Sequence, residues 1–89
     1  MVSEYDKDAA CKIYGSRFRL VRALVKMDQQ EAATRVGLSQ SQLSMIERGL
    51  YEPKAGALIA YSRLYGCSID FLLGLTNSTS IRGGGRIEL

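Results

Sequence analysis

The side chains best suited to chemistry in this chain are amides and hydroxyls gathered on one side of a short predicted helix. Ser41, Ser44, Met45 and Arg48 recur at i, i+3, i+4 and i+7, so they share its outer face. Gln40 opens the same helix, and its carboxamide offers one hydrogen-bond donor and one acceptor. This stripe is suited to recognising another polar surface.

Catalytic chemistry is poorly supported. The sequence contains no histidine, which removes the commonest general base and a frequent metal ligand. The acidic residues are scattered, and the two cysteines, Cys11 and Cys67, lie far apart, so neither a metal cluster nor a disulfide framework is expected. We therefore expect a protein that is not an enzyme and that needs no cofactor or metal.

Length and charge narrow the class further. The chain has 89 residues, enough for one small domain, and 46% of them are hydrophobic. The net charge is +3, and the positive excess falls mainly within 14–75, which gives a mild bias toward polyanionic partners. No apolar run is long enough to span a membrane, and no signal peptide opens the chain. We expect a cytoplasmic protein.

Two short helices with separate start signals position the polar stripe. The first is predicted over 29–36, with Asp28 as its N-cap, and the second over 40–48, with Ser39 as its N-cap. Gly37 ends the first helix, in the left-handed conformation that glycine adopts cheaply. This pattern is typical of a helix-turn-helix, which places one helix in the major groove of DNA.

Three further helices are expected around this pair. They are predicted over 16–27, 54–65 and 69–73, and Gly15 is expected to weaken any helix that continues toward the N-terminus. Ser3 and Asp6 could cap a separate short N-terminal helix. The glycine-rich segment after residue 75 could close a hairpin or form a loose tail, and the tail is preferred.

The residues of the helical region resemble a known family. The sequence is similar to the lambda-repressor-like, Xre-type helix-turn-helix domain over about 14–75, on the following residues: Gln29, Ala33, Gly37, Ser39-Gln40-Ser41, Leu43, Ile46, Glu47-Arg48-Gly49, Pro53 and 66–74. The resemblance implies an all-α, five-helix DNA-binding domain, usually a homodimer on a palindromic operator. Residues 1–13 would then be an N-terminal arm and residues 76–89 a C-terminal tail.

The resemblance also implies contacts to bases. Gln40 corresponds to a glutamine that reads adenine, and Gln29 to a second glutamine that steadies it. The amide chemistry agrees, because adenine presents one acceptor and one donor in the major groove. Ser41 and Met45 correspond to further base-contacting positions, and Ser44 is included beside them.

Other residues are expected to bind DNA phosphates, to stabilise the fold or to form the contact with a second copy of the chain. Phosphate contact or support is assigned to Gln29, Ser39, Gln42, Arg48, Tyr51 and Lys54, with Gln42 favoured as a capping residue. Arg17 and Arg19 are weaker phosphate candidates. The resemblance implies a mostly buried ion pair between Arg22 and Glu47. It also implies a dimer interface at Phe71, Leu72 and Leu73, for which burial within one copy is the rival interpretation.

The sequence therefore predicts a sequence-specific, double-stranded DNA-binding transcriptional regulator, most simply a dimeric repressor. Two alternatives stay open. An antitoxin would use this domain for DNA and another surface for a toxin, although 1–13 and 76–89 are short for that purpose. A protein-interaction module would keep the fold without reading DNA. The identity of any protein partner is left open.

Overall fold

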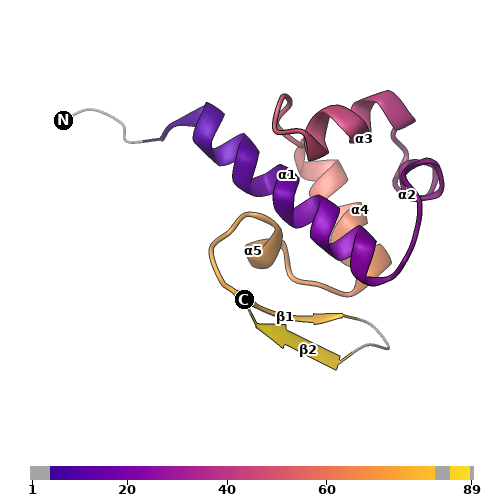
Figure 1. Cartoon of the computed structure of the whole chain (residues 1–89), viewed down its shortest axis with the longest axis vertical. Coiled ribbons are helices and arrows are strands. Elements are labelled where there is room, and N and C mark those ends of the chain that lie inside the picture. The colour runs from indigo at the N-terminus through magenta and orange to yellow at the C-terminus, as the bar shows by residue number, and fades with distance from the viewer. Residues whose placement is uncertain (1–4, 82–84, 89) are drawn as a thin grey trace.

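In a computed structural model, residues 5–81 and 85–88 are described, and they form five helices and one two-stranded sheet (Figure 1). The elements in chain order are α1 (Lys7–Leu24), α2 (Gln29–Val36), α3 (Gln40–Glu47), α4 (Ala55–Tyr65), α5 (Ile69–Leu72), β1 (Ser78–Ile81) and β2 (Gly85–Glu88). The predicted five-helix class is confirmed, and the short sheet is added to it.

Helix α1 begins much earlier than the sequence predicted. Asp6 is its N-cap, since its side chain accepts a hydrogen bond from the Ala9 N–H, and the helix runs unbroken through Gly15. Ser3 lies outside the described residues. The predicted start of this helix at residue 16 was wrong, and Gly15 lies in its interior. The glycine is there because an added Cβ would lie 2.3 Å from the Ile46 carbonyl oxygen of α3. Helix α1 therefore crosses the boundary expected between residues 13 and 14.

The helix-turn-helix forms with the predicted signals. The Asp28 side chain accepts from the Glu31 N–H at the start of α2, and Gly37 ends that helix at φ +78° in the left-handed region. At the start of α3, Ser39 and Gln42 form a reciprocal capping box. Both helices have eight residues, too few to be stable alone, so their packing on the remaining helices must hold them.

The core lies where the five helices meet. Its largest fully buried side chains are Phe18, Val21, Leu43, Ile46, Tyr61, Phe71 and Leu72. The Phe18 and Tyr61 rings stack at 4.0 Å between centroids, and the Tyr61 hydroxyl donates to the Phe18 carbonyl oxygen. The buried hydroxyl is thus satisfied, and α1 is joined to α4 at the centre of the domain.

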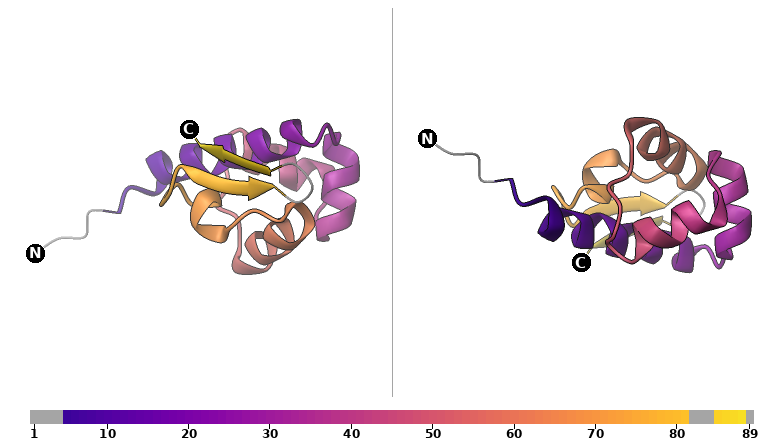
Figure 2. Two further views of the ribbon diagram at one scale, coloured as in Figure 1. Left: turned by 90° about the horizontal axis from the view of Figure 1, so that it is seen from below. Right: turned by 90° about the horizontal axis from the view of Figure 1, so that it is seen from above.

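A hairpin follows the helices where a loose tail was preferred, so that preference was wrong. Strands β1 and β2 pair antiparallel, with Ser78 opposite Glu88 and Ile81 opposite Gly85. Residues 82–84, which include two of the three consecutive glycines, lie outside the described residues. Figure 2 shows the hairpin in front of the helices when seen from below and behind them when seen from above, on the side of the molecule opposite α3.

We expect Gly15→Ala to destabilise the fold, because its Cβ would collide with two backbone carbonyl oxygens of α3, those of Ile46 at 2.3 Å and Glu47 at 2.9 Å. A loss of about 1–3 kcal/mol in the free energy of unfolding follows from such overpacking. Urea unfolding followed by circular dichroism would measure it. Gly56→Ala is the matched control, because nothing lies within 4 Å of its added Cβ. It should raise stability by about 0.5–1 kcal/mol.

Candidate nucleic-acid interface

The outer face of α3 carries the predicted stripe. Its inner face is formed by Leu43 and Ile46, which are fully buried, so the opposite side chains must point outward. The exposed residues are Gln40, Ser41, Met45 and Arg48, with Ser44 half-buried. Together with Gln29 from the start of α2, they line one open groove of about 360 Å³. The sequence-predicted residues of this stripe thus lie on one surface.

Two residues grouped with the phosphate contacts serve the helix itself. The Ser39 hydroxyl oxygen accepts from the Gln42 N–H at 3.1 Å, and the Gln42 side-chain oxygen accepts from the Ser39 N–H at 2.9 Å. Both side chains are therefore engaged at the start of α3. The structure places Gln42 in the capping role that the sequence favoured for it.

A bidentate ion pair lies directly beneath this surface. The Arg22 guanidinium donates to both carboxylate oxygens of Glu47, from Nε at 2.7 Å and from Nη2 at 2.9 Å. It also donates from Nη1 to the Met27 carbonyl oxygen at 3.0 Å. The Glu47 side chain is 3% exposed and that of Arg22 18%. The hydrogen bonds to Glu47 raise the pKa of Arg22, so the guanidinium keeps its charge.

Gln29 connects this ion pair to the outer face. Its Nε2 donates to Glu47 Oε1 at 3.1 Å. Its Oε1 accepts a longer hydrogen bond from Gln40 Nε2 at 3.5 Å. One amide therefore contacts a buried carboxylate on one side and an exposed amide on the other.

The loop after α3 adds cationic and polar groups beside the groove. Arg48 and Lys54 are exposed, and Tyr51 is partly so. Lys54 is the N-cap residue of α4, and no side chain caps that helix, so its first N–H groups have no side-chain acceptor. A second hollow opens here and is lined in part by Gln42, Tyr51, Lys54 and Gly56. An anion is electrostatically favoured at such a helix start.

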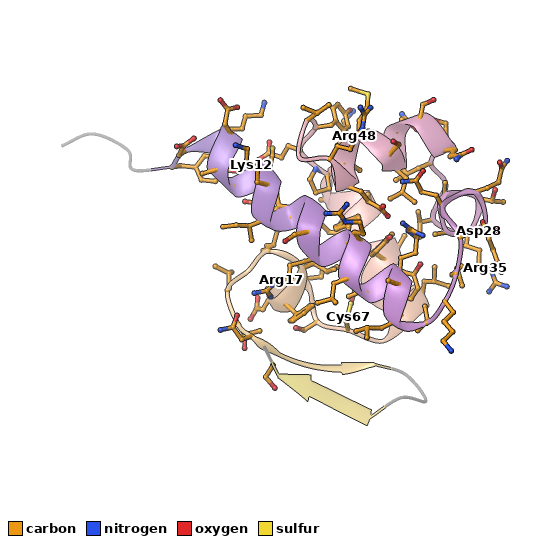
Figure 3. All side chains as sticks on the ribbon, in the orientation of Figure 1. Lys12, Arg17, Asp28, Arg35, Arg48 and Cys67 are labelled. Carbon is orange, nitrogen blue, oxygen red and sulfur yellow. The ribbon has the colours of Figure 1, made fainter. Side chains whose placement is uncertain are left out.

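Arg17, a weak phosphate candidate, lies on the other side of the molecule. Figure 3 shows Arg48 at the outer side of α3 and Arg17 on the side of α1 that faces α5. The Arg17 guanidinium donates to the carbonyl oxygens of Phe71 and Thr76, each at 2.8 Å, and to Asn77 Oδ1. It also lies 4.3 Å from the centre of the Phe71 ring. The phosphate assignment for Arg17 is therefore corrected to a structural role, which its sequence context did not signal.

The predicted dimer interface is corrected in the same region. Phe71 and Leu72 are each 0% exposed, so their side chains cannot contact a second copy. Residue Leu73 is half-buried. The rival interpretation, burial within one copy, describes the first two residues, because α5 has only four residues and uses them to close the core.

The described residues contain no cluster of metal-ligating side chains and no helix long and apolar enough to cross a membrane. Both cysteines are free and buried. Burial raises the pKa of the Cys67 thiol to about 11, so it stays protonated near neutral pH and is a poor nucleophile. Cys67 belongs to the hydrophobic core.

Comparison with known proteins places this surface in a familiar context. The helix-turn-helix family model HTH_3 matches residues 18–72. The chain is 31% identical over 65 residues to the uncharacterized HTH-type transcriptional regulator YobD of Bacillus subtilis, covering 73% of this chain and 58% of YobD. Among the curated relatives it matches, the chain spans between 24% and 58% of their length.

Solved structures show the same arrangement of helices. The P22 c2 repressor in complex with synthetic operator 9T is similar at 37% identity and a TM-score of 0.64, covering 67% of this chain and 91% of that one. The restriction-modification controller protein C.AhdI from Aeromonas hydrophila is similar in fold, with 22% identity and a TM-score of 0.67, covering 72% of this chain and 97% of that one.

We expect Glu47→Ala to lower the free energy of unfolding by about 3 kcal/mol, because it leaves the Arg22 charge without its partner in a mostly buried place. Thermal or urea unfolding would measure the loss. Glu31→Ala is the matched control: it removes an exposed ion pair with Arg35 and should cost no more than about 0.5 kcal/mol. Equal losses in the two variants would show that the buried pair contributes nothing special.

Proposed function

Because the chain belongs to the helix-turn-helix family HTH_3, we propose that it is a sequence-specific, double-stranded DNA-binding transcriptional repressor that acts as a homodimer on a palindromic operator. Members of this family are helix-turn-helix DNA-binding domains of transcriptional regulators. The proposal that this chain reads a specific DNA sequence rests on the side chains at the surface of α3. Repression would be steric, since an occupied operator excludes other proteins from the same DNA.

The observation that carries the proposal is the content of the α3 groove. Its lining is uncharged except for Arg48, and its amide and hydroxyl side chains can form hydrogen bonds with base edges in a major groove. Gln40 is assigned to adenine, and Ser41 and Ser44 to further base edges. Met45, which is 39% exposed, would make apolar contact, for instance with a thymine methyl group.

Phosphate contacts are assigned to the groups that flank the groove. Arg48, Tyr51 and Lys54 lie along the loop after α3, and the uncapped start of α4 lies beside them. Gln29 begins α2, where backbone N–H groups also favour a phosphate. Contacts of this kind would supply much of the affinity and make it fall with salt.

The homodimer would place two copies of α3 in successive major grooves, about 34 Å apart. Since Phe71 and Leu72 belong to the core, the next apolar side chains along the chain are Leu73 and Leu75. Leu75 is 73% exposed. We assign the interface to these two residues, which follow α5 and precede the hairpin.

The experiment that tests the function is selection of binding sites from a random duplex library, followed by Gln40→Ala on the selected site. We expect a two-fold symmetric site, and Gln40→Ala should weaken it by about 1–3 kcal/mol while leaving random-sequence binding nearly unchanged. Arg48→Ala is the contrasting variant: it should weaken both DNAs alike and reduce the salt slope by about one. No enriched site would contradict the proposal and favour the interaction module or an antitoxin that needs its partner.

Substitution at the proposed dimer interface gives a separate prediction. Leu75→Glu would place two charges against each other across the two-fold axis, so the dimer should weaken by at least tenfold, because bringing like charges together costs on the order of several kcal/mol. Sedimentation velocity over a concentration series would measure it. Leu50→Glu is the control, since Leu50 is comparably exposed, at 62%, on the loop after α3. Unchanged dimerisation in the Leu75 variant would place the interface elsewhere.

A further inference from the structure

An unbroken set of hydrogen bonds runs from the interior of the domain to its outer face. Arg22 donates two hydrogen bonds to Glu47, Glu47 accepts a third from Gln29, and Gln29 accepts one from Gln40. The set begins at a carboxylate that is 3% exposed and ends at an exposed amide on α3. The sequence suggested the ion pair and the pair of glutamines separately, but gave no link between them.

The first link fixes the orientation of Gln29. An ionised carboxylate can only accept hydrogen bonds, so the amide nitrogen of Gln29, and not its oxygen, must face Glu47. If the Gln29 amide were reversed, its Oε1 would face Glu47 Oε1 at about the distance that now separates Nε2 from that oxygen, and the two oxygens would repel each other. Gln29 Oε1 is therefore turned toward Gln40.

The hydrogen bond between Gln29 and Gln40 then fixes the orientation of the Gln40 amide. Because an oxygen faces it, Gln40 turns its Nε2 toward Gln29 and spends one N–H there. One N–H and the Oε1 of Gln40 remain for the groove. This donor and acceptor match adenine, which offers N7 as acceptor and N6 as donor.

The opposite orientation would match a different base. If a donor of residue 29 faced Gln40, Gln40 would turn its Oε1 inward and present both of its N–H groups to the groove. Two donors match guanine, which presents N7 and O6 as acceptors. The orientation of the Gln29 and Gln40 amides thus determines whether Gln40 matches adenine or guanine.

We propose that Glu47 is a positioning residue for base recognition: acting through Gln29, its carboxylate orients the Gln40 amide and sets a preference for adenine over guanine. This inference rests on the proposed function, because it presupposes that Gln40 reads a base. It gives Glu47 a role beyond the stability of the fold, and it gives Gln29 a role that does not depend on phosphate contact.

The decisive variant is Gln29→Lys. An ammonium group has donors only, so it can still donate to Glu47 but must also present a donor to Gln40. Gln30→Lys is the matched control, because it adds the same charge at the next, exposed position of α2. The position read by Gln40 is defined as the base pair at which Gln40→Ala loses its preference. The ratio of affinities for adenine and guanine at that position is then measured for each variant by competition binding.

We expect the wild-type protein to prefer adenine there by roughly 5- to 150-fold, the range that a bidentate contact gives. The Gln29→Lys variant should shift that ratio toward guanine at least tenfold, whereas Gln30→Lys should leave it unchanged. Gln29→Met, which offers no strong hydrogen-bonding group, should bring the ratio close to one without reversing it. Circular dichroism would confirm that each variant is folded.

A preference for guanine in the wild-type protein would overturn the inference, and so would an unchanged ratio in Gln29→Lys. Either result would leave the proposed function intact, provided that a site is selected and that Gln40→Ala loses its preference. A wild-type protein that selects no site would contradict the function and the inference together. If Gln29→Lys does not fold, a ratio retained in Gln29→Met overturns the inference by itself.

Discussion

The contact between Arg22 and Glu47 is the constraint on which the rest of the structure depends. It joins α1 to α3, and Gly15, two turns earlier in α1, lets the backbones of the two helices lie close together. Helix α3 has eight residues and could not persist in isolation, so its direction is set by this contact and by the burial of Leu43 and Ile46. The positions of all side chains on its outer face therefore depend on these contacts.

The surface proposed to read DNA and the contacts that hold the hairpin lie on opposite sides of the domain. The side of α3 carries amides, hydroxyls and one arginine, with the uncapped start of α4 beside them. The other side is organised by Arg17, which binds the chain after α5 at Phe71, Thr76 and Asn77 and so fixes where the hairpin begins. Changes near the hairpin should therefore leave the surface proposed to read DNA in place, because the hairpin lies on the opposite side of the molecule from α3 (Figure 2).

Capping residues in the sequence predicted the helices whose ends depend on neighbouring residues. Helices α2 and α3 have strong caps at Asp28, Ser39 and Gly37, and their bounds follow almost residue by residue. The start of α1 was missed because Gly15 looks like a helix breaker until the backbone of α3 is placed against it. The role of Arg17 was missed, and the burial of Phe71 was only the rival interpretation. Both depend on contacts more than fifty positions away in the sequence.

The extension of α1 bears directly on the proposed interface. Its first turns lie outside the family match at 18–72, yet they pack against the loop that follows α3. Tyr5 donates to Glu52 at 2.5 Å and lies 3.1 Å from the Tyr14 hydroxyl; these hydrogen bonds raise the pKa of Tyr5. Lys12 lies against Gly49. Because the same loop carries the groups proposed to bind phosphates, residues outside the shared domain hold part of the interface in place, and the affinity for DNA need not follow from the matched region alone.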